Sequence, residues 1–145
     1  MVVLPTGSSV AHASMIWCSS VTAAYFDVED PFADYVVHEA AHVFHNTKRK
    51  TLGLHATRRR EWLLPIEFVK RETFAYACEF YSRILELGKR PSERKELLEK
   101  LKERPPLSDD RADFEELLEI LDRAVNRRNG WKTILERCSS NNRAR

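Results

Sequence analysis

The hydrophobic and polar positions divide the chain into an apolar N-terminal stretch and a series of helical segments. Residues 14–28 (SMIWCSSVTAAYFDV) are rich in β-branched and aromatic side chains and contain no glycine, proline or charge before Asp27. This composition is typical of β-strands, so we expect one or two strands before residue 30. Asp30 and Pro31 are helix-start residues, and the following apolar pattern predicts a helix that runs to about Asn46.

Helical patterns continue through the rest of the chain. A second helix is predicted from Pro65 to Leu87, because no breaker interrupts this stretch and Gly88 favours a helix end. Three shorter helical segments follow, separated by proline or glycine: they lie after Pro91, between Asp109 and Arg128, and after Gly130. The predicted fold class is α+β, mainly helical with a small N-terminal β-sheet. A length of 145 residues fits one domain, with strands in 1–29, two longer helices in 30–88 and C-terminal helices in 91–138.

Composition excludes several classes of protein. The chain is 32% charged and 43% hydrophobic, as in globular proteins, and no apolar run reaches the roughly 18–20 residues that a membrane helix needs. Its first basic residue is Lys48, so the positive region of a secretory signal is missing. The three cysteines, Cys18, Cys78 and Cys138, are too dispersed for a disulfide framework. We therefore expect a soluble, cytoplasmic protein.

Charge is distributed unevenly along the chain. The net charge is +2, yet residues 1–47 carry five acidic and no basic side chains. The basic excess gathers in Lys48–Lys50 and Arg58–Arg60, where it can attract phosphates or remain a solvated loop. This stretch lacks the interleaved aromatic residues of a single-strand binding platform, so a nucleic-acid partner is not favoured.

The strongest chemical signal is the sequence His38-Glu39-Ala40-Ala41-His42, an HExxH pattern inside the first predicted helix. Helix positions i and i+4 lie about 40° apart, so His38 and His42 can offer imidazole nitrogens to one zinc ion. Glu39 lies about 60° around the helix from His42, on the flank where it can act as a general base. The pattern predicts one Zn²⁺ per chain, and a pair of purely structural histidines is the alternative.

Zinc requires a third protein ligand. The HExxHxxGxxH form would need glycine at position 45 and histidine at position 48, where the chain has His45 and Lys48. A carboxylate on the second helix is therefore expected, and the candidates are Glu61, Glu67, Glu72 and Glu79. Glu72 is preferred because it lies among apolar residues, where an unpaired carboxylate would be costly to bury. Glu67 and Glu79 remain open, as does a solvated polar face of this helix.

The HEAAH sequence, followed about thirty residues later by Glu72-Thr-Phe-Ala-Tyr-Ala-Cys-Glu79, resembles the ImmA/IrrE-type peptidases over roughly residues 30–85. These are zincins with a glutamate ligand on the second helix. The resemblance implies a zincin-like fold in which His38, His42 and Glu72 bind zinc and Glu39 is the general base.

Two further residues are candidates for supporting roles. Tyr76 lies one helical turn after Glu72 and can donate a hydrogen bond to a ligand or to the oxyanion of a tetrahedral intermediate. His45 lies on the same helix face as His42. It can hydrogen-bond to a metal ligand and fix the orientation of that ligand without binding the metal itself. Ordinary packing is the alternative for both residues.

The predicted function is that of a zinc-dependent peptidase that hydrolyses a peptide bond in a peptide or protein substrate. The alternative is a non-catalytic interaction protein with a zincin-like fold, whose charged helices after Pro91 dock a partner. Neither the cleavage specificity nor the oligomeric state follows from the sequence.

Overall fold

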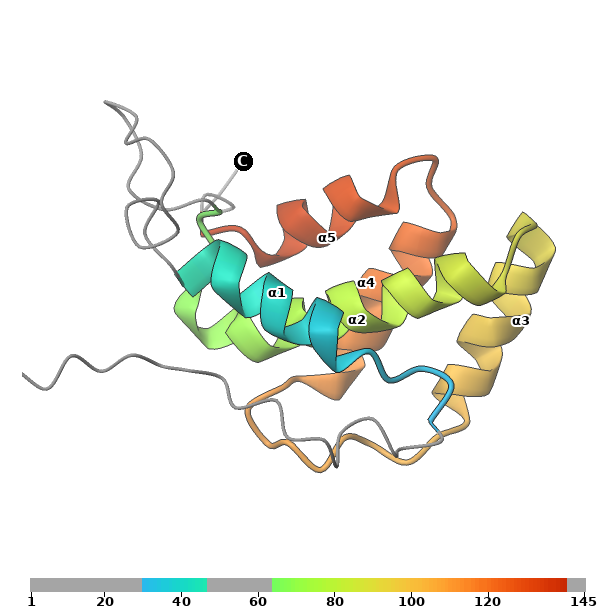
Figure 1. Ribbon diagram of the computed structural model, residues 1–145, viewed down its shortest axis with the longest axis horizontal. Helices are drawn as coiled ribbons and strands as arrows, with labels where there is room; N and C mark the ends of the chain where they lie inside the picture. Colours follow the sequence, from blue (N-terminus) through green and yellow to red (C-terminus); the bar gives the residue numbers. More distant parts are fainter. Residues whose placement is uncertain (1–29, 47–63, 141–145) are drawn as a thin grey trace, which may run out of the picture.

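Five α-helices and one short 3₁₀ helix make up most of the part of the chain that the computed structural model describes, residues 30–46 and 64–140 (Figure 1). They are α1 (Tyr35–Asn46), η2 (Phe68–Lys70), α2 (Arg71–Leu87), α3 (Pro91–Lys102), α4 (Phe114–Val125) and α5 (Gly130–Cys138). No helix of this part is both long and apolar enough to cross a lipid bilayer.

The predicted α+β class is wrong for the described residues, of which 69% are helical. Residues 30–46 and 64–140 contain no strand or sheet, and extended pairing there is limited to one isolated bridge between Ile66 and Ser139. The strands expected within residues 14–28 lie outside the described residues. Strand propensity largely reports packing against neighbouring strands, so composition alone is weak support for a sheet.

Helix α2 is the central element, because it packs against α1, α3, α4 and α5 (Figure 1). The largest apolar side chains that are at most 2% exposed come from α2, α3, α4 and α5: Ile84, Leu98, Leu101, Leu117, Ile120, Leu121 and Ile134. Burying one such side chain stabilises the fold by about 1.5–3 kcal/mol. The position of α2, and of the polar residues on it, is therefore set largely by a core that it shares with α3, α4 and α5.

Helix α1 begins later than the sequence suggests. Asp34 caps it, since its Oδ1 accepts a hydrogen bond from the Val37 backbone N–H at 3.1 Å. Asp30 has a different role: its carboxylate accepts two hydrogen bonds from Arg104, at 2.9 and 2.6 Å. The ion pair ties the segment before α1 to the residues just after α3. Because α1 begins at Tyr35, His38 lies in the first turn of its helix.

Helix α2 also begins later than predicted, at Arg71 instead of Pro65, although it ends before Gly88 as expected. The residues before η2 are extended and bonded to the end of α5. The Glu67 N–H donates to the Cys138 carbonyl at 2.9 Å, and the Pro65 carbonyl accepts from the Ser140 N–H at 3.1 Å. Glu72 therefore stands in the first turn of α2 and not in the middle of a longer helix.

The expected helix from Asp109 is shorter than predicted, because Asp113 caps α4 by accepting a hydrogen bond from the Glu116 N–H at 2.9 Å. Residues 103–113 instead form the connection between α3 and α4.

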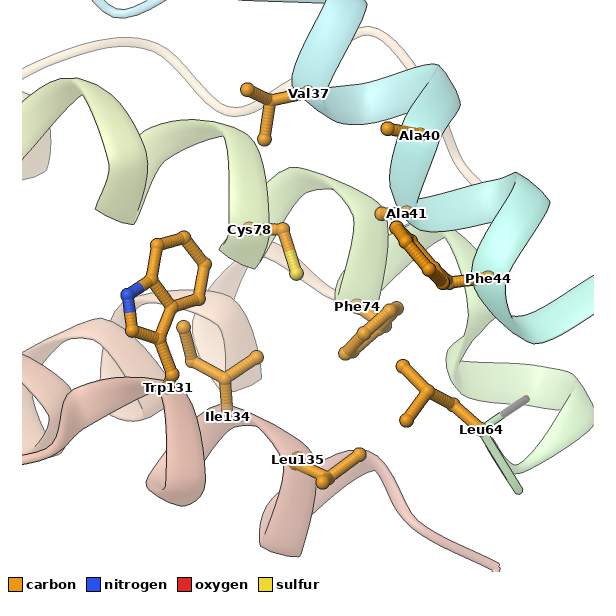
Figure 2. Close-up of a pocket in the computed structure, with 10 residues that line it drawn as sticks. All are labelled: Val37, Ala40, Ala41, Phe44, Leu64, Phe74, Cys78, Trp131, Ile134 and Leu135. Carbon is orange, nitrogen blue, oxygen red and sulfur yellow. The ribbon is translucent and has the colours of Figure 1, made fainter.

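An apolar cavity of about 290 Å³ lies between α1, α2 and α5 (Figure 2). Four α1 residues line it, Val37, Ala40, Ala41 and Phe44, and they follow the spacing of a single helix face. The α1 histidines project from a different face. The cavity is therefore separate from the polar cluster of α1, and its walls offer almost no polar groups.

Gly130 begins α5 where this helix passes Tyr81 of α2. A Cβ atom at this position would lie 2.2 Å from the Tyr81 hydroxyl oxygen and 2.6 Å from the Ala124 carbonyl oxygen.

We predict that Gly130→Ala lowers the free energy of unfolding by about 1–3 kcal/mol, because overpacking forces neighbours apart. Urea denaturation followed by circular dichroism measures the change. Lys132→Ala, at an exposed position of the same helix, should stay within about 0.5 kcal/mol of the parent protein. An unchanged or more stable Gly130→Ala protein would contradict this close packing.

Candidate metal centre

The packing of α1 on α2 brings His38, His42 and Glu72 together. The two imidazole Nε2 atoms are 3.2 Å apart. Glu72 Oε2 lies 3.2 Å from Nε2 of His42 and 3.7 Å from Nε2 of His38. The three residues that the sequence predicts as ligands therefore direct one atom each toward a common point.

The spacing of these three atoms fits a single zinc ion. Zinc bonds to histidine nitrogen and carboxylate oxygen are about 2.0–2.2 Å long, and tetrahedral geometry then places ligand atoms about 3.3–3.6 Å apart. The three observed separations lie close to this range. Two nitrogens and one carboxylate oxygen also form a donor set that zinc uses in catalytic sites, where a fourth position stays open.

Both histidines have their second ring nitrogen engaged by a neighbour. The Nδ1 atom of His38 lies 3.0 Å from Glu79 Oε2, and the Nδ1 atom of His42 lies 3.0 Å from Nε2 of His45. An ionised carboxylate accepts hydrogen bonds, so Nδ1 of His38 donates to Glu79, and Nε2 is the ring nitrogen that faces His42 and Glu72. Such partners fix the ring orientation of metal-binding histidines. His45, which is itself buried, has the position expected of such a supporting residue.

Glu79, an alternative third ligand in the sequence, does not join the three-residue group. Its side chain is only 3% exposed, with Oε1 accepting a hydrogen bond from the Asp34 N–H at 2.7 Å and Oε2 facing His38 Nδ1. The carboxylate thus lies behind His38, on the side away from Nε2. Glu79 anchors the first turn of α1 and orients one imidazole.

Of the other two alternative ligands, Glu67 is not part of the group, and Glu61 cannot be placed. Glu67 precedes η2, where its backbone is bonded to the end of α5. Glu61 lies outside the described residues.

Glu39 is half-buried on α1, beside the histidine face.

Burial lowers the pKa of His42, and the nearby His38 acts in the same direction. The negative charges of Glu72 and Glu39 act in the opposite direction, yet the net pKa of His42 is below its ordinary value. The imidazole therefore favours the neutral form, which is the form that binds a metal.

Tyr76 packs edge-on against the His38 ring, with ring centroids 4.5 Å apart. Burial is the main reason that the pKa of Tyr76 rises to about 12, and the carboxylates of Asp109, Glu79 and Glu72 add to it. The phenol consequently remains protonated and can donate a hydrogen bond beside the candidate metal ligands.

Two residues of the α3–α4 connection were missed by the sequence analysis. Arg111 places Nη1 3.5 Å from Glu72 Oε1, the carboxylate oxygen that faces away from the closer histidine contacts. Asp109 holds Arg111 through its Nε at 2.9 Å, its Nη2 at 2.8 Å and its backbone N–H at 3.0 Å. These hydrogen bonds keep the pKa of Asp109 below its ordinary value. No spacing in the sequence signals this approach, because it depends on the tertiary path of the connection.

Comparison of the chain with protein-family models, with curated proteins and with solved structures gives no match. The resemblance to the ImmA/IrrE-type peptidases therefore stays a prediction.

The role of Glu79 can be tested in metal-free protein. We predict that Glu79→Leu lowers the free energy of unfolding by about 1–3 kcal/mol, because the Asp34 N–H and His38 Nδ1–H lose their acceptor in a buried environment. Urea denaturation in the presence of a chelator measures the change. Glu96→Leu, at an exposed position on α3, is the control and should change little. Equal stability of the two variants would show that Glu79 does not anchor α1.

Proposed function

We propose that this protein is a zinc-dependent peptidase whose zinc ion is held by His38, His42 and Glu72. The main support is the mutual spacing of their three ligand atoms, 3.2, 3.2 and 3.7 Å, on histidines whose Nδ1 atoms are already engaged. Among the residues that the structure describes, no fourth side chain joins these three, which fits the open position of a catalytic zinc site.

The chemistry divides between the metal and the side chains around it. Zinc, when bound, would polarise the scissile carbonyl and lower the pKa of water toward about 7. Glu39 is the general base: it takes the proton of the attacking water and passes it to the leaving amine. Its place between the two histidines of α1 puts it next to the cluster without making it a member.

Tyr76 complements Glu39. Its phenol stays protonated, and its ring lies against His38 on the α2 side of the centre. A hydroxyl there can donate a hydrogen bond to the oxygen that becomes negative as the carbonyl is attacked. The site would then have a base on α1 and a donor on α2.

The alternative is a non-catalytic interaction protein. The observation that favours it is that the cluster is already connected internally: Glu79 contacts His38, His45 contacts His42, and His42 contacts Glu72. A satisfied polar network can serve as structure alone. Two measurements distinguish a peptidase from a non-catalytic interaction protein: the zinc content of the purified protein, and the effect of replacing Glu39 on peptide hydrolysis.

We predict that the purified protein binds about one zinc ion per chain, and that His38→Ala, His42→Ala and Glu72→Ala each lose most of it, because each removes one of three ligands. Elemental analysis after dialysis measures the content. Glu67→Ala is the matched control and should keep its zinc. Full zinc retention by Glu72→Ala would remove this residue from the ligand set, and absence of zinc from the parent protein would remove the metal centre.

We predict that Glu39→Gln reduces peptide hydrolysis by about 10²- to 10⁴-fold, because the amide keeps the shape of the carboxylate but cannot accept the proton. Zinc content and melting temperature should remain those of the parent. The assay is cleavage of a peptide library followed by mass spectrometry, with Glu96→Gln on α3 as the matched substitution. A Glu39→Gln protein with full activity would contradict the mechanism, whereas loss of zinc in this variant would assign Glu39 a structural role.

A further inference from the structure

Arg111 presents a hydrogen-bonding edge that residues 30–46 and 64–140 leave open. A guanidinium group has two edges that can each bind a carboxylate with two parallel hydrogen bonds. Asp109 occupies the edge formed by Nε and Nη2. The remaining edge, which includes Nη1, is the one on the side of Glu72.

The contact with Glu72 does not close this second edge. Its Nη1 to Oε1 separation of 3.5 Å exceeds the length of an ordinary charged hydrogen bond, about 2.7–2.9 Å. The Arg111 side chain is 69% exposed, whereas the Asp109 side chain that holds it is only 14% exposed. The largely buried carboxylate of Asp109 therefore holds the guanidinium of Arg111 in place. Arg111 itself is accessible from solvent next to Glu72.

A structural role alone does not account for this arrangement. Ion pairs of exposed arginines contribute little to stability. Fixing a guanidinium in advance does, however, reduce the entropy lost when it binds a planar anion. The charge of Arg111 also stands close to two carboxylates, those of Asp109 and Glu72. An anionic ligand would be repelled by these carboxylates wherever the arginine did not compensate their charge.

We propose that Arg111 is a specificity-determining residue that binds a carboxylate of the peptide substrate next to the bond to be cleaved. The proposal rests on the proposed peptidase function. The carboxylate belongs either to the C-terminus of the peptide or to an acidic side chain, and both would use the same open edge of the guanidinium. Asp109 is the positioning residue that keeps this edge turned toward the centre.

Binding can be measured without hydrolysis in a Glu39→Gln background. Three pools of fluorescently labelled random hexapeptides are compared by anisotropy: one without acidic residues and with a free C-terminus, the same pool with an amidated C-terminus, and an amidated pool with one acidic residue. Arg111→Gln should weaken binding of a carboxylate-bearing pool by about 10- to 100-fold, the value of a lost charged hydrogen-bond pair, and leave the neutral amidated pool unchanged. If the pool with a free C-terminus loses affinity, Arg111 binds the C-terminal carboxylate. If the amidated acidic pool loses affinity, Arg111 binds an acidic side chain.

Arg123→Gln, at an exposed position on α4, is the control, because it removes the same charge without touching the site. Asp109→Asn should give a smaller loss for the same pool, since the guanidinium then loses its anchor. Equal binding of all pools by Arg111→Gln and Arg123→Gln would overturn the proposal, as would failure of the parent protein to prefer either carboxylate pool. Zinc content of the same samples is determined separately, so loss of the metal centre and loss of carboxylate recognition are distinguishable.

Discussion

The arrangement of the site depends on the buried carboxylate of Glu79. A charge that is removed from water must be compensated by hydrogen bonds, and both compensating donors, the Asp34 N–H and His38 Nδ1–H, belong to α1 and the residue that caps it. The contact therefore sets where α1 meets α2. Glu72 lies seven residues before Glu79, almost two full helical turns, and so projects from the same face of α2. Holding α1 at Glu79 places the two Nε2 atoms against Glu72.

Helical periodicity explains why the sequence indicates the histidine pair. It also explains why the sequence limits the third candidate ligand to a few carboxylates. His38 and His42 share a face wherever an HExxH segment is helical, so their approach requires no tertiary information. The same rule puts Glu72 and Glu79 on one face, and for that reason it cannot distinguish them. Which of the two meets Nε2 and which meets Nδ1 depends on how α1 crosses α2, and this is decided by packing in the core.

Other expectations failed where distant residues decide the local structure. Asp30 and Asp34 are both suitable caps, and the choice between them follows from the pairing of Asp30 with Arg104, far along the chain. The first turns expected after Pro65 are instead extended and bonded to the end of α5. Asp109 and Arg111 reach the centre from a connection whose path has no local signature. The N-terminal sheet rested on strand propensity alone, which is meaningful only with known neighbours.

The division of the site between helices and a connection has a consequence for how the protein can change. The candidate metal ligands and their supporting residues lie on two helices that pack against each other, so most substitutions there disturb the core. The connection between α3 and α4 contributes Arg111 and Asp109 from outside that core, and a segment of this kind tolerates replacement more readily. Asp109 and Arg111 can therefore be exchanged in evolution or by protein engineering while the candidate metal ligands on α1 and α2 stay in place, as long as Arg104 and Asp113, which hold the segment before α1 and cap α4, are kept.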